Sequence, residues 1–172
     1  MTAAVLAAWI GQDRFERQAA APGFEAALVD GRDVAAIAEV ARGFGSALIQ
    51  RDDAGDPMIE GRIHGVVYRI YFYGCIEGAD CRHLLLKAEW DNDGIDTLAF
   101  VNAWNRHRLL GRAYIDHDDT KISLDLIINL ARGVSLYNLD DTFAWWADTL
   151  WDFHVKTRDI PPAPARAAET DL

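Results

Sequence analysis

The sequence predicts an α+β domain built on an antiparallel sheet of about six strands, with the element order α-ββββ-α-ββ-α. Several short stretches alternate apolar and polar residues, which is typical of half-buried strands. Three other stretches place apolar residues at helical spacing. The strand-like stretches follow one another across short turns instead of alternating with helices, which indicates hairpins and therefore an antiparallel sheet.

Size and charge limit the class of protein further. The chain has 172 residues, of which 51% are hydrophobic and 26% are charged, so one domain with a substantial core is expected. Its formal net charge of −10 opposes binding to nucleic acid and to anionic membranes, and we expect neither as a partner. No run of apolar residues is long enough to predict a membrane span.

We divide the chain into an N-terminal extension (1–32), an α+β domain (33–157) and a disordered Pro/Ala-rich tail (158–172). Within the extension, 4–18 is predicted to form a short amphipathic helix. No positively charged segment precedes its apolar run, so an export signal is not predicted and a cytoplasmic location is expected.

The first helix of the domain is expected over 34–42, with Asp33 as its N-cap and Gly43 as its stop. Four strands forming a meander are expected next, at 46–50, 58–63, 66–73 and 82–90.

A second helix is expected over 94–108, capped by Asp93, with Leu98 and Val101 on its apolar stripe. Strands at 112–117 and 121–128 follow. The last helix is expected to begin after Ser135 or Asn138, with one continuous apolar stripe made by Leu139, Phe143, Trp146, Leu150 and Phe153.

Cys75 and Cys81 flank the loop between the third and fourth strands. Strand alternation places both on one face at the mouth of the hairpin, where a disulfide is geometrically reasonable. Such a bridge would contribute about 2 kcal/mol at most to the stability of the fold, because it closes only a small loop. Two unpaired thiols fit the sequence equally well. A bridge would indicate an oxidising compartment such as the periplasm, with the true start of the chain elsewhere, which conflicts with the missing export signal.

No motif for catalysis or for binding a metal is present. The sequence lacks H-E-x-x-H, P-loop, G-x-G-x-x-G and G-x-S-x-G patterns, and the five histidines fall in five different elements. The acidic residues Asp116, Asp118, Asp119 and Asp125 lack the Gly and terminal Glu of a calcium loop, so a solvated turn is expected. We therefore predict no catalytic residues, no metal and no cofactor.

Aromatic residues are the best candidates for a binding surface. Trp145 lies off the apolar stripe of the last helix and, with Trp151, is a candidate for contact with a partner. Tyr71 and Tyr73 share a strand face with Leu85. For all of these residues, the alternative is cover by a second layer of the same chain.

Four segments, GDPMI (55–59), YRIYFYGC (68–75), FVNAWNRHRLLGRAYID (100–116) and ARGVS (131–135), together resemble the YbjN-type domain over roughly 33–153. The resemblance implies a bacterial sensory transduction regulator with a fold like that of type III secretion chaperones. Those chaperones are small α+β domains that bind other proteins and often dimerise. Similar family members are secreted and carry a cysteine pair in the equivalent hairpin.

The most telling match is V-N-x-W-N, at Val101, Asn102, Trp104 and Asn105, followed by Tyr114 on the next strand. We expect Asn102 and Asn105 to face inward and to bind backbone groups of strand 112–117 or of the loop before it, since buried amides need hydrogen bonds. The alternative is that they contact a ligand.

These observations predict a non-enzymatic protein-interaction or regulatory module with a chaperone-like fold. We expect it to bind a protein partner, and a homodimer is a possible form of the protein. The alternative is a sensor of a small molecule or metal ion. Its pocket would lie between sheet and helix, lined by Asn102, Asn105, Tyr114 and the acidic hairpin.

Overall fold

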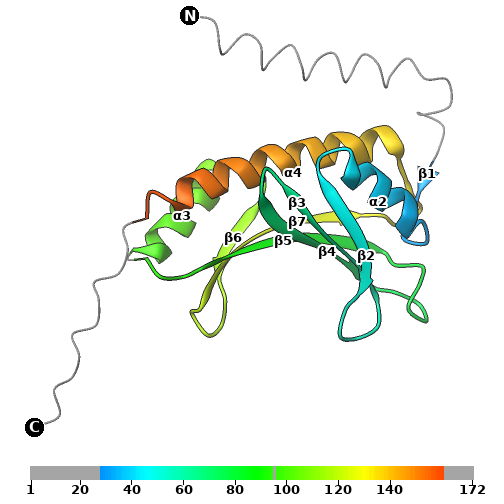
Figure 1. Ribbon diagram of the computed structural model, residues 1–172, viewed down its shortest axis with the longest axis horizontal. Coiled ribbons are helices and arrows are strands. Elements are labelled where there is room, and N and C mark those ends of the chain that lie inside the picture. The colour runs from blue at the N-terminus through cyan, green and yellow to red at the C-terminus, as the bar shows by residue number, and fades with distance from the viewer. Residues whose placement is uncertain (1–27, 95, 161–172) are drawn as a thin grey trace, which may run out of the picture.

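The computed structural model describes residues 28–94 and 96–160, and its elements follow the predicted order (Figure 1). The predicted helix over 4–18 and the tail after Ile160 lie outside the described residues. The principal elements are α2 (Val34–Arg42), β2 (Ser46–Arg51), β3 (Pro57–Ile63), β4 (Val66–Tyr73), β5 (His83–Asp91), α3 (Thr97–His107), β6 (Arg112–Ile115), β7 (Lys121–Asn129) and α4 (Leu136–Thr157).

The predicted α+β class is confirmed. Six strands form one antiparallel sheet in the order β2-β3-β4-β5-β7-β6, so β7 lies between β5 and the edge strand β6. Two short strands, β1 (Leu28–Val29) and β8 (Val134–Ser135), pair with each other outside this sheet. Sequence patterns missed them because two residues carry no periodicity.

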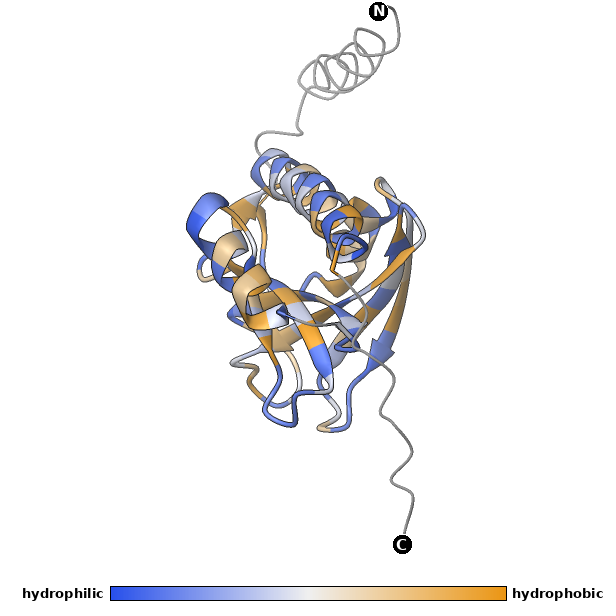
Figure 2. Ribbon diagram, turned by 90° about the vertical axis from the view of Figure 1, so that its left-hand side faces the viewer, coloured by the Kyte–Doolittle hydropathy of each residue, from blue (hydrophilic) through white to orange (hydrophobic). Residues whose placement is uncertain are grey.

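The helices of residues 28–94 and 96–160 cover one side of the sheet and leave the other without a helix. In Figure 1, α2 and α4 lie across its upper side, while the β2–β3 and β6–β7 hairpin loops extend from the lower side. Hydrophobic and hydrophilic positions alternate along the strands (Figure 2), as expected for strands with one buried face. No helix in the described part of the chain is long and apolar enough to cross a membrane.

The core lies between the sheet and α4. All five residues of the predicted stripe on α4 have no solvent exposure, and Ser135 caps the helix by accepting a hydrogen bond from the backbone of Asn138. Trp104, Trp90 and Phe100 pack their rings against Phe153, with centroids 4.7 to 5.3 Å away. The apolar stripe therefore predicted both the last helix and its buried face.

The start and buried face of α3 differ from the prediction. The helix begins at Thr97 instead of residue 94, and it follows Asp96, which has a left-handed backbone (φ 58°) and makes no side-chain cap. Thr97, Val101 and Trp104 are buried, whereas Leu98 is 65% exposed. The packing of Trp104 against Phe153 fixes the rotation of the helix, and this turns Leu98 outward.

Candidate functional site

The side of the sheet that no described helix covers, here called the open face, carries the outward-pointing side chains of the six strands. Their inward neighbours fill the core, so alternation assigns every second residue to this face. Its central members come from β4 (Val67, Arg69, Tyr71, Tyr73), β5 (His83, Leu85, Lys87, Glu89), β6 (Arg112, Tyr114) and β7 (Lys121, Ser123, Asp125, Ile127).

One end of the open face is apolar. Tyr73 is 49% exposed and Ile127 is 64% exposed, and the rings of Tyr71 and Tyr73 lie 6.4 Å apart. A hollow of about 470 Å³ is lined by Tyr73, His83, Leu84, Leu85, Arg112 and Ile127. The predicted residues Tyr71 and Tyr73 thus lie on a surface that no helix of the described residues covers.

The middle of the open face carries linked ion pairs. Arg69 pairs with Glu60 at 2.8 Å, and Lys87 pairs with Glu89, also at 2.8 Å. A second hollow, of about 350 Å³, is lined by Val67, Tyr68, Arg69, Tyr71, Lys87, Ala88, Glu89 and Lys121. Burial raises the pKa of Tyr71, so its hydroxyl remains protonated at neutral pH.

Arg112 and Asp125 form a forked ion pair on the same face. Nε and Nη2 of Arg112 donate to the two carboxylate oxygens of Asp125 at 3.1 and 2.5 Å. The Asp125 side chain is only 2% exposed, whereas that of Arg112 is 64% exposed. The hydrogen bonds that Arg112 donates to Asp125 raise the pKa of Arg112, and the guanidinium lies 4.9 Å from the centre of the Tyr114 ring.

Sequence reasoning missed this pair. It grouped Asp125 with the solvated acidic turn, but the structure places Asp125 within β7, buried opposite Arg112 of β6. The hairpin register explains the miss. A three-residue turn at Asp118 to Thr120 would pair residue 117 with 121 and therefore Arg112 with Leu126, whereas the observed register is shifted by one residue and pairs Arg112 with Asp125.

The two candidate tryptophans lie away from the open face. Both belong to α4, which covers the other side of the sheet, and Trp145 is 49% exposed and Trp151 is 44% exposed. The Trp151 ring lies 5.5 Å from that of His64 and 5.8 Å from that of His154. The structure therefore separates the tryptophans from Tyr71 and Tyr73, and these four residues do not form one surface.

The V-N-x-W-N motif is divided in its contacts. Asn105 Nδ2 donates to the Ala113 carbonyl oxygen and Asn105 Oδ1 accepts from the Ala113 N–H, both at 2.9 Å. Trp104 Nε1 donates to the carbonyl oxygen of Gly111 at 2.8 Å. Asn102 and Asn105 are both exposed, so the expectation that they face inward is wrong, although Asn105 does bind the backbone of strand 112–117 as expected. Tyr114 lies on the open face, and these residues do not line a common pocket.

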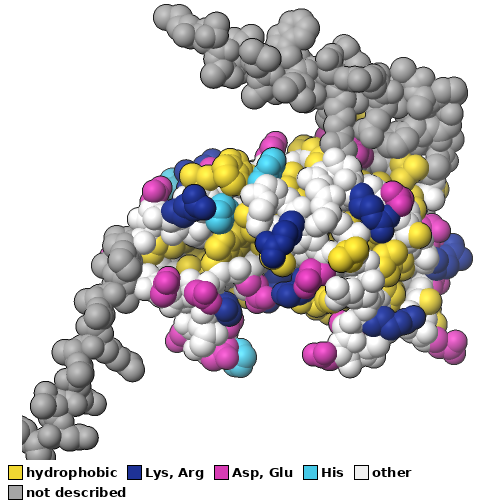
Figure 3. Space-filling model, viewed as in Figure 1, with side chains coloured by type: hydrophobic (Ala, Val, Ile, Leu, Met, Phe, Trp, Pro, Cys, Tyr) yellow, Lys and Arg dark blue, Asp and Glu magenta, His cyan; other side chains and the backbone are white. Residues whose placement is uncertain are grey.

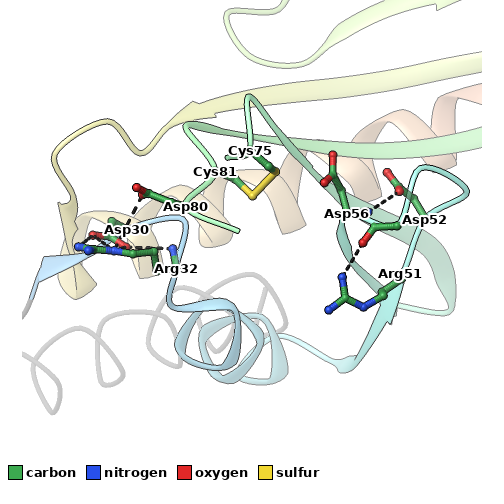
Figure 4. Close-up of a disulfide and its surroundings, with 9 residues drawn as sticks. Asp30, Arg32, Arg51, Asp52, Asp56, Cys75, Asp80 and Cys81 are labelled. Carbon is green, nitrogen blue, oxygen red and sulfur yellow. Dashed lines mark hydrogen bonds and ion pairs between the residues drawn. A yellow bond between two sulfur atoms is a disulfide. The ribbon is translucent and has the colours of Figure 1, made fainter. Parts of the chain in front are cut away.

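Cys75 and Cys81 are joined by a disulfide beside the start of the domain (Figure 4). Cys81 is 2% exposed and forms a β-bridge with Gly31. A Cβ at position 31 would lie 1.8 Å from the Cys81 carbonyl oxygen, so this approach requires glycine. Arg32 is 3.9 Å from Asp80 at the same place. The disulfide loop thus holds the segment that precedes α2.

Within 28–94 and 96–160, no three His, Cys, Asp or Glu side chains gather in a way that could hold a metal ion. The acidic turn is organised internally instead. Asp116 accepts hydrogen bonds from the Lys121 backbone at 2.8 Å and from the Thr120 hydroxyl at 3.0 Å. The hydrogen bond from the Lys121 backbone is the main cause that lowers the pKa of Asp116. Burial acts in the opposite direction, and the bond from the Thr120 hydroxyl lowers the pKa further.

Comparison with known proteins places this arrangement in a family. The family model described as "YbjN: Putative bacterial sensory transduction regulator" matches residues 33–154, which is more than half of the chain. The chain belongs to the YbjN family. This confirms the resemblance drawn from residues 55–59, 68–75, 100–116 and 131–135. A search of curated proteins found no match.

Two solved structures are similar to this YbjN family member. The crystal structure of YbjN from E. coli has 14% sequence identity and a TM-score of 0.49, covering 80% of this chain and 100% of its own. A chain in the crystal structure of the ExsC–ExsE complex has 20% identity and a TM-score of 0.43, covering 71% of this chain and 96% of its own.

Proposed function

We propose that this chain is a non-catalytic regulatory module that binds a partner protein on its open face. The observation that carries the proposal is the uncovered apolar end of the sheet, where Tyr73 and Ile127 are 49% and 64% exposed. The opposite face of the same sheet is filled by helices. Contiguous apolar surface of this kind, bordered by polar residues, marks interaction sites in soluble proteins.

The composition of the open face supports the same proposal. Tyrosine and arginine are enriched at protein interfaces and contribute most to binding, because they combine a large contact area with directed hydrogen bonds. Here Tyr71, Tyr73 and Tyr114 lie among Arg69 and Arg112 on one surface. These side chains rest on a sheet rather than a loop, so little conformational entropy is lost when a partner orders them.

The family description adds support of a different kind. The family model describes a bacterial sensory transduction regulator, and a regulator that works by contact needs a surface for its partner. A surface with large exposed apolar side chains and preformed ion pairs suits that role.

The proposal is tested by site-specific photo-crosslinking in the native host. A photoreactive amino acid is placed at position 73 or 127 of the full chain, and at position 98 as a control. Leu98 is 65% exposed, which matches the 64% of Ile127, but it lies on α3. We expect the same protein to crosslink at 73 and 127 and not at 98.

Paired substitutions complete the test. Ile127→Asp should reduce co-purification of the crosslinked partner at least tenfold, since burying a carboxylate in an apolar contact is costly. Leu98→Asp should leave it unchanged. Absence of crosslinks at 73 and 127, or equal crosslinking at 98, would overturn the proposal.

A further inference from the structure

We propose that the open face binds an acidic peptide segment that carries a large apolar side chain. A carboxylate of the segment lies on Arg112, and the apolar side chain fills the hollow beside Tyr73 and Ile127. This inference rests on the proposed function and adds the chemistry of the partner.

The first argument is the distribution of charge. The chain carries a formal net charge of −10. The strands nevertheless direct more basic than acidic side chains to the open face, namely Arg62, Arg69, Lys87, Arg112 and Lys121 against Glu60, Glu89, Asp91 and Asp125. The excess of acidic residues therefore lies outside these strands, in part on the two hairpin loops that border the open face, and an acidic segment meets less repulsion over the strands than over those loops.

The second argument is the geometry of Arg112. Asp125 occupies the Nε–Nη2 edge of the guanidinium. No hydrogen bond joins Nη1 to any described residue, and the side chain is 64% exposed. Asp125 is buried beneath it, and the Tyr114 ring lies against it at 4.9 Å. The guanidinium is thus held by Asp125 and Tyr114 and keeps its Nη1–Nη2 edge without a described acceptor for Nη1, and such an edge can bind a carboxylate through two hydrogen bonds.

The third argument is that the two parts of the ligand meet at one place. Arg112 lines the hollow of about 470 Å³ together with Tyr73, Leu85 and Ile127. A segment with a carboxylate on Arg112 therefore has an adjacent side chain within reach of the apolar wall. Burial of that side chain supplies affinity, and the carboxylate supplies orientation.

The shape favours a peptide over a small carboxylic acid. On β4, Val67 to Arg69 and Tyr71 line the hollow of about 350 Å³ and Tyr73 lines the other, so the two hollows follow each other along the strand. At about 3.3 Å per residue, this stretch of β4 spans roughly 20 Å, the length of an extended segment of about six residues. Figure 3 shows the molecule hollowed on its lower side, between the two hairpins.

The test begins with selection of random peptides displayed on phage against the full chain. We expect selected peptides to place Asp or Glu within a few residues of Leu, Ile, Phe or Trp. The affinity of one selected peptide is then measured by fluorescence anisotropy. Changing its acidic residue to the amide should weaken binding by roughly tenfold or more, and raised salt should also weaken it.

A matched pair of double variants assigns the effect to Arg112. Arg112→Gln with Asp125→Asn removes the guanidinium without leaving a lone buried charge. This double variant should bind the acidic peptide only as weakly as the natural chain binds the amide version of the peptide. Arg108→Gln with Asp152→Asn removes another Arg–Asp pair, 2.7 Å apart, between the residue that follows α3 and a residue of α4, and should leave the affinity for the peptide unchanged.

The remaining outcomes overturn the inference. Selection of basic peptides, no selection at all, or equal effects of the two double variants would each do so. If dodecanoate bound as tightly as the selected peptide, the ligand would be a small amphipathic acid and not a peptide. If crosslinking at 73 and 127 succeeds but the crosslinked segment is not acidic, this inference fails while the proposed function stands. Failure of the crosslinking removes both.

Discussion

The contact between Trp90 and His154 depends on the protonation state of a single ring. Trp90 Nε1 donates a hydrogen bond to His154 Nδ1 at 3.0 Å, so Nδ1 must be unprotonated. Burial lowers the pKa of His154 below the ordinary 6.5, and the positive charge of Arg158 lowers it further. The histidine therefore contributes stability in its neutral form, fully above pH 6.5, and this contribution is lost as the pH falls through the lowered pKa.

His154→Gln should flatten the dependence of stability on pH. The free energy of unfolding, measured with urea at pH 7.5, 6.5 and 5.5, should fall for the natural chain because unfolded His154 binds protons more readily than the folded form. Glutamine accepts a hydrogen bond without titrating, so the variant should lose part of this fall. His117→Gln is the control, since its side chain is 94% exposed. Equal slopes for the natural chain and His154→Gln would contradict the assignment.

At the scale of elements, α3 closes one edge of the sheet. Asn105 bonds both backbone groups of Ala113, so its amide takes the place that a neighbouring strand would occupy. Trp104 bonds the adjacent Gly111 in the same way. An edge strand with unpaired backbone groups invites pairing with other chains. The helix thus serves both as a core element and as a cover for β6.

Asn105→Ala should destabilise the domain by about 1–3 kcal/mol, because the two backbone groups of Ala113 lose their partners. Asn102→Ala is the matched control. Both asparagines are exposed on the same helix, but the Asn102 side chain makes no hydrogen bond to a described residue, so a change within about 0.5 kcal/mol is expected. Urea unfolding followed by tryptophan fluorescence measures both. If Asn102→Ala lowered the free energy of unfolding as much as Asn105→Ala, the proposed role of Asn105 in holding β6 would be refuted.

The sequence was sufficient for elements with a long, regular pattern. The α4 stripe and the alternation in β4 and β7 located those elements within about two residues, because burial of one face imposes a period on the sequence. The start of α3 was wrong, since Asp93 offers a good cap but packing of Trp104 decides where the helix lies. The Arg112–Asp125 pair was missed because it depends on register between strands, which no single stretch reveals.

At the scale of the whole molecule, the disulfide loop joins the beginning of the domain to the sheet. Gly31 pairs with Cys81, and the Leu130 N–H donates to the carbonyl oxygen of neighbouring Arg82 at 2.8 Å. The loop between β4 and β5 therefore contacts both the segment before α2 and the segment before α4. Opening it should loosen these connections together without altering the centre of the sheet.

Replacing both cysteines with serine should lower the free energy of unfolding by about 2 kcal/mol, because the bridge closes only a short loop. Hydrogen exchange should increase at residues 28–32 and 74–82 and stay unchanged in β5 and β7. The mass of the unreduced natural chain, about 2 Da below that of the reduced chain, checks that the bridge is formed. Uniform faster exchange across the sheet would contradict a local role.

The closure of β6 by Asn105 also limits how copies of this domain can join through their backbones. In the described part of the chain, β2 is the other outer strand of the six. The Asp52 N–H donates to the Asp56 carbonyl oxygen, so alternate residues of β2 bond β3 and the residues between them direct their backbone N–H and C=O groups away from β3. Ile49 is one of the residues whose backbone groups point away. If the β2 strands of two copies paired, the outer strand at each end of the joined sheet would be a β6 that Asn105 already covers. Addition of copies through the sheet edges would therefore end at a two-fold symmetric pair and could not continue into a fibril.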